Sequence, residues 1–141
     1  MSIPPPEAEW YLPTLVTVHD GGRWVSGFDF ASRRGRPVHV ITAWNPGDER
    51  PSLDTNRLRN DQLKVELETM GFEVFAALGS DPHSEHAEES LAVVGMSDEQ
   101  ATEVGCLFDQ VAIFRIEASS QHVLGCSANW AVSRPRSARD S

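Results

Sequence analysis

The chain has 141 residues and carries 12 Lys plus Arg against 21 Asp plus Glu, a net charge of −9. This length suits one domain with its own core, and the 40% hydrophobic content excludes a disordered body. The negative charge repels a phosphate backbone, so we expect no nucleic-acid partner. Because no stretch approaches the ~20 consecutive apolar residues of a membrane span, and residues 1–12 do not resemble a signal peptide, we expect no membrane association and a cytoplasmic location.

Three segments are expected along the chain. Residues 1–9 include three consecutive prolines and are expected to form a flexible lead-in. Residues 133–141 are rich in Ser and Arg without apolar periodicity, which is typical of a flexible tail. The segment between them, residues 10–132, is expected to fold as a single α+β domain.

The first part of this domain favours strands. Residues 14–18 are β-branched and alternating, and residues 20–22 supply an Asp-Gly-Gly turn before a second strand at 24–28, which predicts a hairpin. Residues 38–44 are apolar on nearly every position, as expected of a strand covered on both faces. The Asn-Pro-Gly sequence at 45–47 ends that strand.

Two helices are predicted from caps and apolar periodicity. Asp54 is the expected N-cap of the first, whose apolar residues recur on one face as far as Met70. Ser97 and Gln100 fit a capping box, in which each side chain bonds the other residue's backbone N–H, and the second helix runs to about Phe108.

The remaining strands are expected at 72–78, 91–94, 111–117 and 122–126. From residue 38 to residue 117 the order is therefore β-α-β-β-α-β, which is the arrangement of the ferredoxin-like fold. The N-terminal hairpin and the last strand would widen this mostly antiparallel sheet. In that topology the first and third strands are central, which agrees with their apolar sequences.

Motifs of recognised chemistry are few. His83 and His86 lie among carboxylates that suit Zn²⁺, but a loop does not fix ligands and no third ligand is paired with them, so we expect no metal site. The chain has no G-x-S-x-G motif and no phosphate-binding glycine loop, and we expect no cofactor. Cys106 and Cys126 are expected to be small buried hydrophobes in a reducing compartment.

Two amides stand out at the start of the first predicted helix. At about 100° per residue, Asn56 and Asn60 fall on the side of the helix that carries Leu63 and Leu67. Their side chains should therefore point inward, where a polar group must find a hydrogen-bond partner. Either they tether the loop at 45–53, or they face a ligand in a cleft.

Four short motifs occur in a characteristic order: I-T-A-x-N-P at 41–46, an Asn with a following Arg and Asn at 56–60, E-x-S at 88–90, and F-x-Q-x-A at 108–112. Together they resemble an uncharacterised bacterial family, the domain of unknown function 3293. The resemblance covers residues 10–126. It implies no known activity, substrate or cofactor, but it indicates which residues to follow.

The chain departs from the family pattern at two positions. Asp109 stands where the family usually has a small residue such as Gly, in a tight turn. Trp44 stands where the family often has His or Tyr, so a proton-transfer role at that position is not carried over.

The expected topology brings the family-like segments to one rim of the sheet. The end of the first strand, the start of the first helix, the loop between the second and third strands, and the start of the last strand all reach that rim. The residues expected to converge there are Asn45, Asn56, Glu88, Ser90 and Gln110.

This cluster predicts a small binding module that recognises a small polar ligand or a protein partner. The expected ligand-binding residues are Asn45, Asn56, Asn60, Ser90 and Gln110. The alternative is a small hydrolase or transferase that uses Glu88 as general acid or base. A third alternative is an assembly protein that uses an exposed sheet edge. One carboxylate with several amides supplies hydrogen bonds but no nucleophile, which favours binding.

Overall fold

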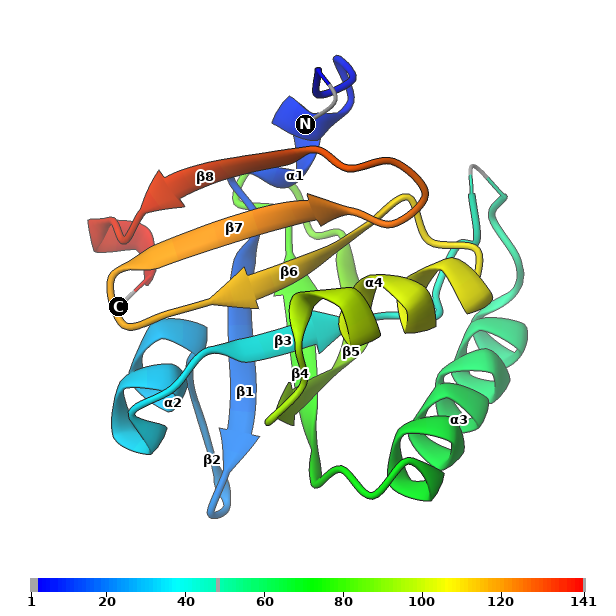
Figure 1. The fold of residues 1–141 in the computed structure, drawn as a ribbon, viewed down its shortest axis with the longest axis horizontal. Coiled ribbons are helices and arrows are strands. Elements are labelled where there is room, and N and C mark those ends of the chain that lie inside the picture. Colours follow the sequence, from blue (N-terminus) through cyan, green and yellow to red (C-terminus); the bar gives the residue numbers. More distant parts are fainter. Residues whose placement is uncertain (1–2, 48, 141) are drawn as a thin grey trace.

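The structure of the protein is a computed structural model that describes residues 3–47 and 49–140. Its eight strands form one curled sheet in the order β2-β1-β4-β5-β3-β6-β7-β8, and all neighbouring strands are antiparallel. Figure 1 shows β6, β7 and β8 lying across β1 and β4 because of this curl. The strands are β1 (Leu15–Asp20), β2 (Arg23–Ser26), β3 (Val38–Ile41), β4 (Val74–Ser80), β5 (Ala87–Val94), β6 (Ala112–Ile116), β7 (Ser120–Gly125) and β8 (Ala131–Pro135).

Two helices cover one face of the sheet, α3 (Leu53–Thr69) and α4 (Asp98–Leu107). Leu63 and Leu67 of α3 pack with Ile41 of β3 in a buried cluster that also contains Val104 of α4. Along β3 successive side chains alternate between faces, so Ile41 faces these helices and Val40 faces away.

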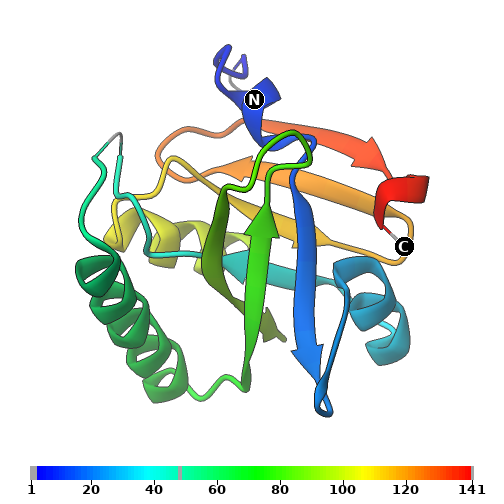
Figure 2. The ribbon, with the colours of Figure 1, turned by 180° about the vertical axis from the view of Figure 1, so that it is seen from behind.

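The opposite face carries α1 (Ala8–Tyr11) and α2 (Gly27–Arg34). Phe28 and Phe30 of α2 pack on Val40 in a second buried cluster. Ala8 at the start of α1 packs on Val123 of β7 in a third. The view from behind in Figure 2 shows the N-terminal segment at one end of this face and α2 at the other. The stretch of sheet between them is where the cavity described below is found.

The α+β class and the antiparallel sheet are confirmed, with differences in the bounds of some strands. The predicted strand at 24–28 ends at Ser26, because the Ser26 hydroxyl accepts the Asp29 N–H at 3.0 Å and starts α2. Gly35 ends that helix in a left-handed conformation, with φ of 64°. Strand β5 starts at Ala87, before the strand expected at 91–94, so only residues 81–86 separate it from β4.

The expected flexible tail at 133–141 is ordered as far as the structure describes it. Its first residues complete β8, and residues 138–140 form a short 3₁₀ helix. The carboxylate of Asp140 is 2% exposed and accepts both terminal nitrogens of Arg134 at 2.9 Å, and Arg134 also donates to the Thr14 carbonyl. The Ser- and Arg-rich composition hides this order because the arginine is buried together with its partner. Residue 141 lies outside the described residues.

The expected lead-in at 1–9 is partly structured as well. Among its described residues, Ala8 is 1% exposed and begins α1. Its apolar contacts with β7 and β8 come from the far end of the chain, which a local pattern does not reveal. Residues 1 and 2 lie outside the described residues.

Of the two predicted helix N-caps, one is confirmed and one is wrong. The capping box of α4 is confirmed, with Ser97 and Gln100 bonding each other's backbone N–H groups at 3.1 and 3.0 Å. The N-cap of α3 is Ser52 and not Asp54, because the Ser52 hydroxyl accepts the Thr55 N–H at 3.2 Å. Asp54 lies in the first turn, where a carboxylate still interacts favourably with the helix dipole.

Both cysteines are unpaired, but only one matches its expected burial. Cys126 is partly buried, and burial raises the pKa of its thiol to about 12, with a further contribution from Cys106. Cys106 is exposed on α4, so the expectation that it is buried is wrong. A helix of ten residues with one covered face has room for a polar or small residue on its outer side.

Within residues 3–47 and 49–140, none of the helices combines the length and the apolar sequence needed to cross a membrane.

Replacing Ser52 with Ala should lower the free energy of unfolding by about 1 kcal/mol, because the N-cap bond to Thr55 is lost. Asp54→Ala is the matched control and should cost about 0.5 kcal/mol, since it removes only the interaction with the helix dipole. Urea denaturation of both variants measures the difference. If Asp54→Ala lowered the free energy of unfolding more than Ser52→Ala did, Asp54 and not Ser52 would be the N-cap.

Asp140→Asn should destabilise the fold by about 2 kcal/mol at pH 7, because it leaves the partly buried Arg134 guanidinium without a counter-charge, an effect that solvent screens in part. Burial opposes ionisation of Asp140, but bonds from Arg134 and Ser137 outweigh it and lower its pKa. The stabilisation is therefore complete above about pH 4, near the unfolded pKa, and disappears as the pH falls through the lower folded pKa. Urea titrations from pH 2.5 to 7 should show the gap to wild type closing in acid. Arg139→Ala, at an exposed neighbour, should leave stability unchanged.

Candidate functional site

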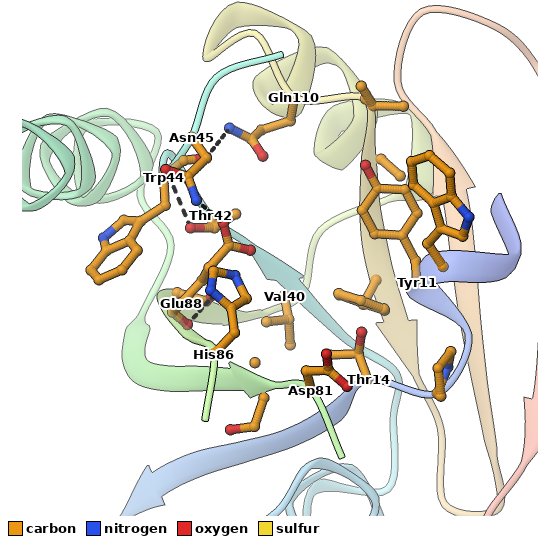
Figure 3. Close-up of a pocket in the computed structure, with 18 of the residues that line it drawn as sticks. Tyr11, Thr14, Val40, Thr42, Trp44, Asn45, Asp81, His86, Glu88 and Gln110 are labelled. Carbon is orange, nitrogen blue, oxygen red and sulfur yellow. Dashed lines mark hydrogen bonds between the residues drawn. The ribbon is translucent and has the colours of Figure 1, made fainter. Parts of the chain in front are cut away.

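A cavity of about 280 Å³ opens on the sheet face between α1 and α2. Its floor is formed by inward-facing side chains of three adjacent strands, among them Val40, Glu88 and Phe114. Residues 10–14 form one wall and the 79–82 turn forms another. Figure 3 shows the labelled side chains around the cavity, with Glu88 and Gln110 on one side and Tyr11 on the other. The site thus combines the N-terminal segment with strands and loops of the central part of the chain, as far as Phe114.

The segment that follows β3 is held in place by the first turns of α3. The Ala43 N–H donates to Asn60 Oδ1 at 3.2 Å, and the Ala43 carbonyl accepts Arg59 Nε at 3.0 Å. Two residues on, the Asn45 N–H donates to Asn56 Oδ1 at 3.0 Å. These bonds satisfy backbone groups that have no strand partner there. They hold Asn45 in a left-handed conformation, with φ of 47°, which Asn tolerates better than most residues.

The orientation of these amides follows from one backbone group. Because an N–H only donates, the oxygen of the Asn56 amide must face Asn45 N, which leaves Asn56 Nδ2 to donate to Asn45 Oδ1 at 3.0 Å. Asn45 Nδ2 must then point the other way, and it donates to Glu88 Oε1 at 2.9 Å. The relay therefore presents a donor to one carboxylate oxygen of Glu88 and leaves the other oxygen outside the relay.

Gln110 is oriented in the same way on the other side. Its Nε2 donates to the carbonyls of Trp44 and Phe108, at 3.1 and 3.3 Å, and a carbonyl can only accept. Asp109, the departure from the family pattern, has φ of 61°, in the left-handed region where glycine is favoured. The turn therefore keeps the geometry of a glycine turn. The Asp109 carbonyl accepts the Gly47 N–H at 2.8 Å, and this bond joins the turn to the segment after β3.

Burial shifts the pKa values of two ionisable side chains of the cavity. It raises the pKa of Glu88, and the opposing effects of His86, Asn45 and Arg50 do not cancel this increase. Burial also raises the pKa of Tyr11, and the negative charge of Glu88 adds to that shift. Within the described ranges 3–47 and 49–140, no ion pair involves Glu88. A carboxylate that is half-buried without a counter-charge is costly at neutral pH.

The structure brings most of the predicted site residues together. Asn45, Glu88, Ser90 and Gln110 all line the cavity. Asn56 and Asn60 lie behind its wall, 4% and 9% exposed, where their oxygens accept backbone N–H groups. For these two residues, loop tethering describes the observed contacts.

Residues 10–14 also line the cavity, and their part in the site was not anticipated. Trp10 and Tyr11 lie between the predicted lead-in at 1–9 and the first predicted strand, which starts at Thr14, and no motif marks them. Arg59 entered the sequence analysis only through the family resemblance, yet it donates to both the Ala43 carbonyl and the Phe108 carbonyl. A long side chain about one turn after Asn56 is the signal that could have suggested this role.

Metal-ligating groups are dispersed over the described part of the chain, in which no three His, Cys, Asp or Glu side chains are placed to share an ion. His83 lies in the 81–86 loop, where its N–H donates to Asp81 at 2.9 Å. His86 is exposed at the edge of the cavity.

Comparison with known proteins gives one match. The family described as Protein of unknown function (DUF3293) matches residues 41–113, which contain Asn45, Asn56, Glu88 and Gln110. The comparisons with curated proteins and with solved structures returned no match.

Glu88→Gln should stabilise the protein at pH 7. Because the fold raises the pKa of Glu88, it favours the protonated form, so the stability contributed by this residue is complete below about pH 4 and is lost as the pH rises through the folded pKa. A neutral Gln avoids that loss, and the advantage of the variant should grow from pH 4 to pH 7 in urea denaturation. Glu89→Gln is the control, since Glu89 is exposed and pairs with Arg57. A destabilised Glu88→Gln at pH 7 would contradict the argument.

Proposed function

The chain belongs to the DUF3293 family, and we propose that it is a binding protein that holds a small polar ligand in the cavity over Glu88. The observation that carries this proposal is the relay from Asn56 through Asn45 to Glu88, which directs a carboxylate into a cavity instead of into the core. Residues that only stabilise a fold rarely keep a half-buried carboxylate without a counter-charge, because burial disfavours its ionised form.

The size of the cavity supports a small molecule in preference to a protein segment. A volume of about 280 Å³ lies just below the usual range for ligand pockets and corresponds to about nine water molecules. Its lining combines aromatic side chains, such as Tyr11 and Phe114, with many polar ones, among them Glu88 and Gln110. That mixture suits a polar ligand, because apolar contacts supply affinity while the polar groups select the ligand.

The architecture we propose for the core is ferredoxin-like. The strand order β4-β5-β3-β6, with α3 and α4 packed on one face, supports a β-α-β-β-α-β core over residues 38–117. We also propose a cytoplasmic location, which two unpaired thiols, one of them exposed, support.

A second candidate function is proton transfer by Glu88 in a small hydrolase or transferase. The raised pKa of this carboxyl supports it, since a general acid or base works best with a pKa near the operating pH. The Tyr11 ring in the same cavity could help to position a substrate. Binding is preferred because the partner of Glu88 is an amide, Asn45, which cannot exchange protons with it.

A thermal-shift screen of polar metabolites should find compounds that stabilise the wild-type protein. A ligand present at a hundred times its Kd stabilises the folded state by about 2.7 kcal/mol. Glu88→Gln should lose the shift, whereas Glu89→Gln, on the other face of β5, should keep it. Turnover of a bound compound that stops in Glu88→Gln would favour the enzyme. Equal thermal shifts in both variants would show that the ligand binds somewhere other than this cavity.

A further inference from the structure

The internal hydrogen bonds of the site use the donors of four of its polar side chains, whereas the indole N–H of the lining residue Trp44 is buried without a partner among residues 3–47 and 49–140. Asn45 Nδ2 is directed to Glu88, and Gln110 Nε2 is directed to two carbonyls. The Thr42 hydroxyl donates to the Glu89 carbonyl at 2.7 Å, and the Ser90 hydroxyl donates to the Glu88 carbonyl at 3.2 Å. Four polar side chains of the lining therefore donate hydrogen bonds to other groups of the protein.

Two acceptors are left at the cavity. The relay occupies Glu88 Oε1, so Oε2 keeps its lone pairs. Since Gln110 turns its nitrogen to the carbonyls of Trp44 and Phe108, its oxygen is the free end of the amide, and Figure 3 shows that oxygen on the cavity side. A ligand that matches this surface must donate hydrogen bonds.

The charge of the site points in the same direction. Glu88 has no counter-ion within residues 3–47 and 49–140, although Arg50 and His86 lie at exposed positions on the cavity edge. Asp81, on the opposite wall, adds a second carboxylate. A cationic donor would compensate the buried negative charge and form a charge-assisted bond, which is about twice as strong as a neutral one.

The apolar part of the lining also suits a cation. The lining includes the aromatic residues Trp10, Tyr11 and Phe114, and Figure 3 shows Tyr11 on the side of the cavity opposite Glu88. Such rings attract a positive charge through their π faces and bury an alkyl chain.

We infer that the ligand is a small primary amine, whose ammonium group donates hydrogen bonds to Glu88 Oε2 and Gln110 Oε1 while its alkyl part packs against the aromatic rings of the lining. This inference rests on the proposed function and specifies the chemical class that the cavity binds. It assigns Asn45 and Asn56 a positioning role, since they set the direction in which Glu88 points.

The test uses three probes of one carbon skeleton: n-butylamine, n-butanol and butyrate. Each is titrated into the full chain in phosphate buffer, and the backbone amide resonances of Glu88 and Gln110 are followed by NMR. The amine should shift both resonances in a saturable way and bind about tenfold more tightly than the alcohol, as expected for one charge-assisted bond. Butyrate should bind more weakly than the alcohol.

Glu88→Gln should weaken amine binding about tenfold and leave alcohol binding unchanged, while Glu89→Gln should bind all three probes as wild type does. Because Glu88→Gln is expected to be more stable than wild type, lost binding is not a folding defect. Tighter binding of butyrate or butanol overturns the ligand class and leaves the proposed function standing. Failure of every probe, together with an empty metabolite screen, overturns both.

Discussion

The donation of the Asn45 backbone N–H to Asn56 Oδ1 is the interaction on which the site depends. It fixes which way the Asn56 amide faces, which in turn orients Asn45 and places a donor on Glu88. Through three successive hydrogen bonds, this backbone N–H thereby determines which amide atom faces Glu88. The segment after β3 is irregular, yet α3 holds it as firmly as a strand would, through Asn56, Arg59 and Asn60.

Much of the central architecture follows from local sequence signals. The capping box at Ser97, the apolar run of β3 and the periodicity of α3 mark elements that the structure contains. The convergence of Asn45, Glu88, Ser90 and Gln110 on one cavity follows from strand order once those elements are assigned. Local patterns suffice here because each of these elements is stabilised mainly by its own caps and its own buried stripe.

The rest depends on contacts that no local pattern carries. Helix α2 follows a hairpin strand directly, and its cap at Ser26 is inconspicuous among strand-forming residues. Strand β8 includes Arg134, which is partly buried against Asp140, so its composition resembles that of a tail although it pairs with β7. Trp10 and Tyr11 reach the cavity only because β7 and β8 support the segment that carries them. Such features become visible only when both ends of the chain are considered together.

The contact between the chain ends has a consequence for how the protein matures. Thr14, on the cavity wall, presents its carbonyl to Gln121 at 2.8 Å and to Arg134 at 2.9 Å, and Arg134 is in turn held by Asp140. These partners follow α3, β4 and β5 in the sequence, so a nascent chain on the ribosome can complete those elements before it can close this wall. The cavity can therefore take its full shape only after residues 121–140 have been synthesised, and a chain that terminates before Gln121 would lack these wall contacts even where its helices had folded.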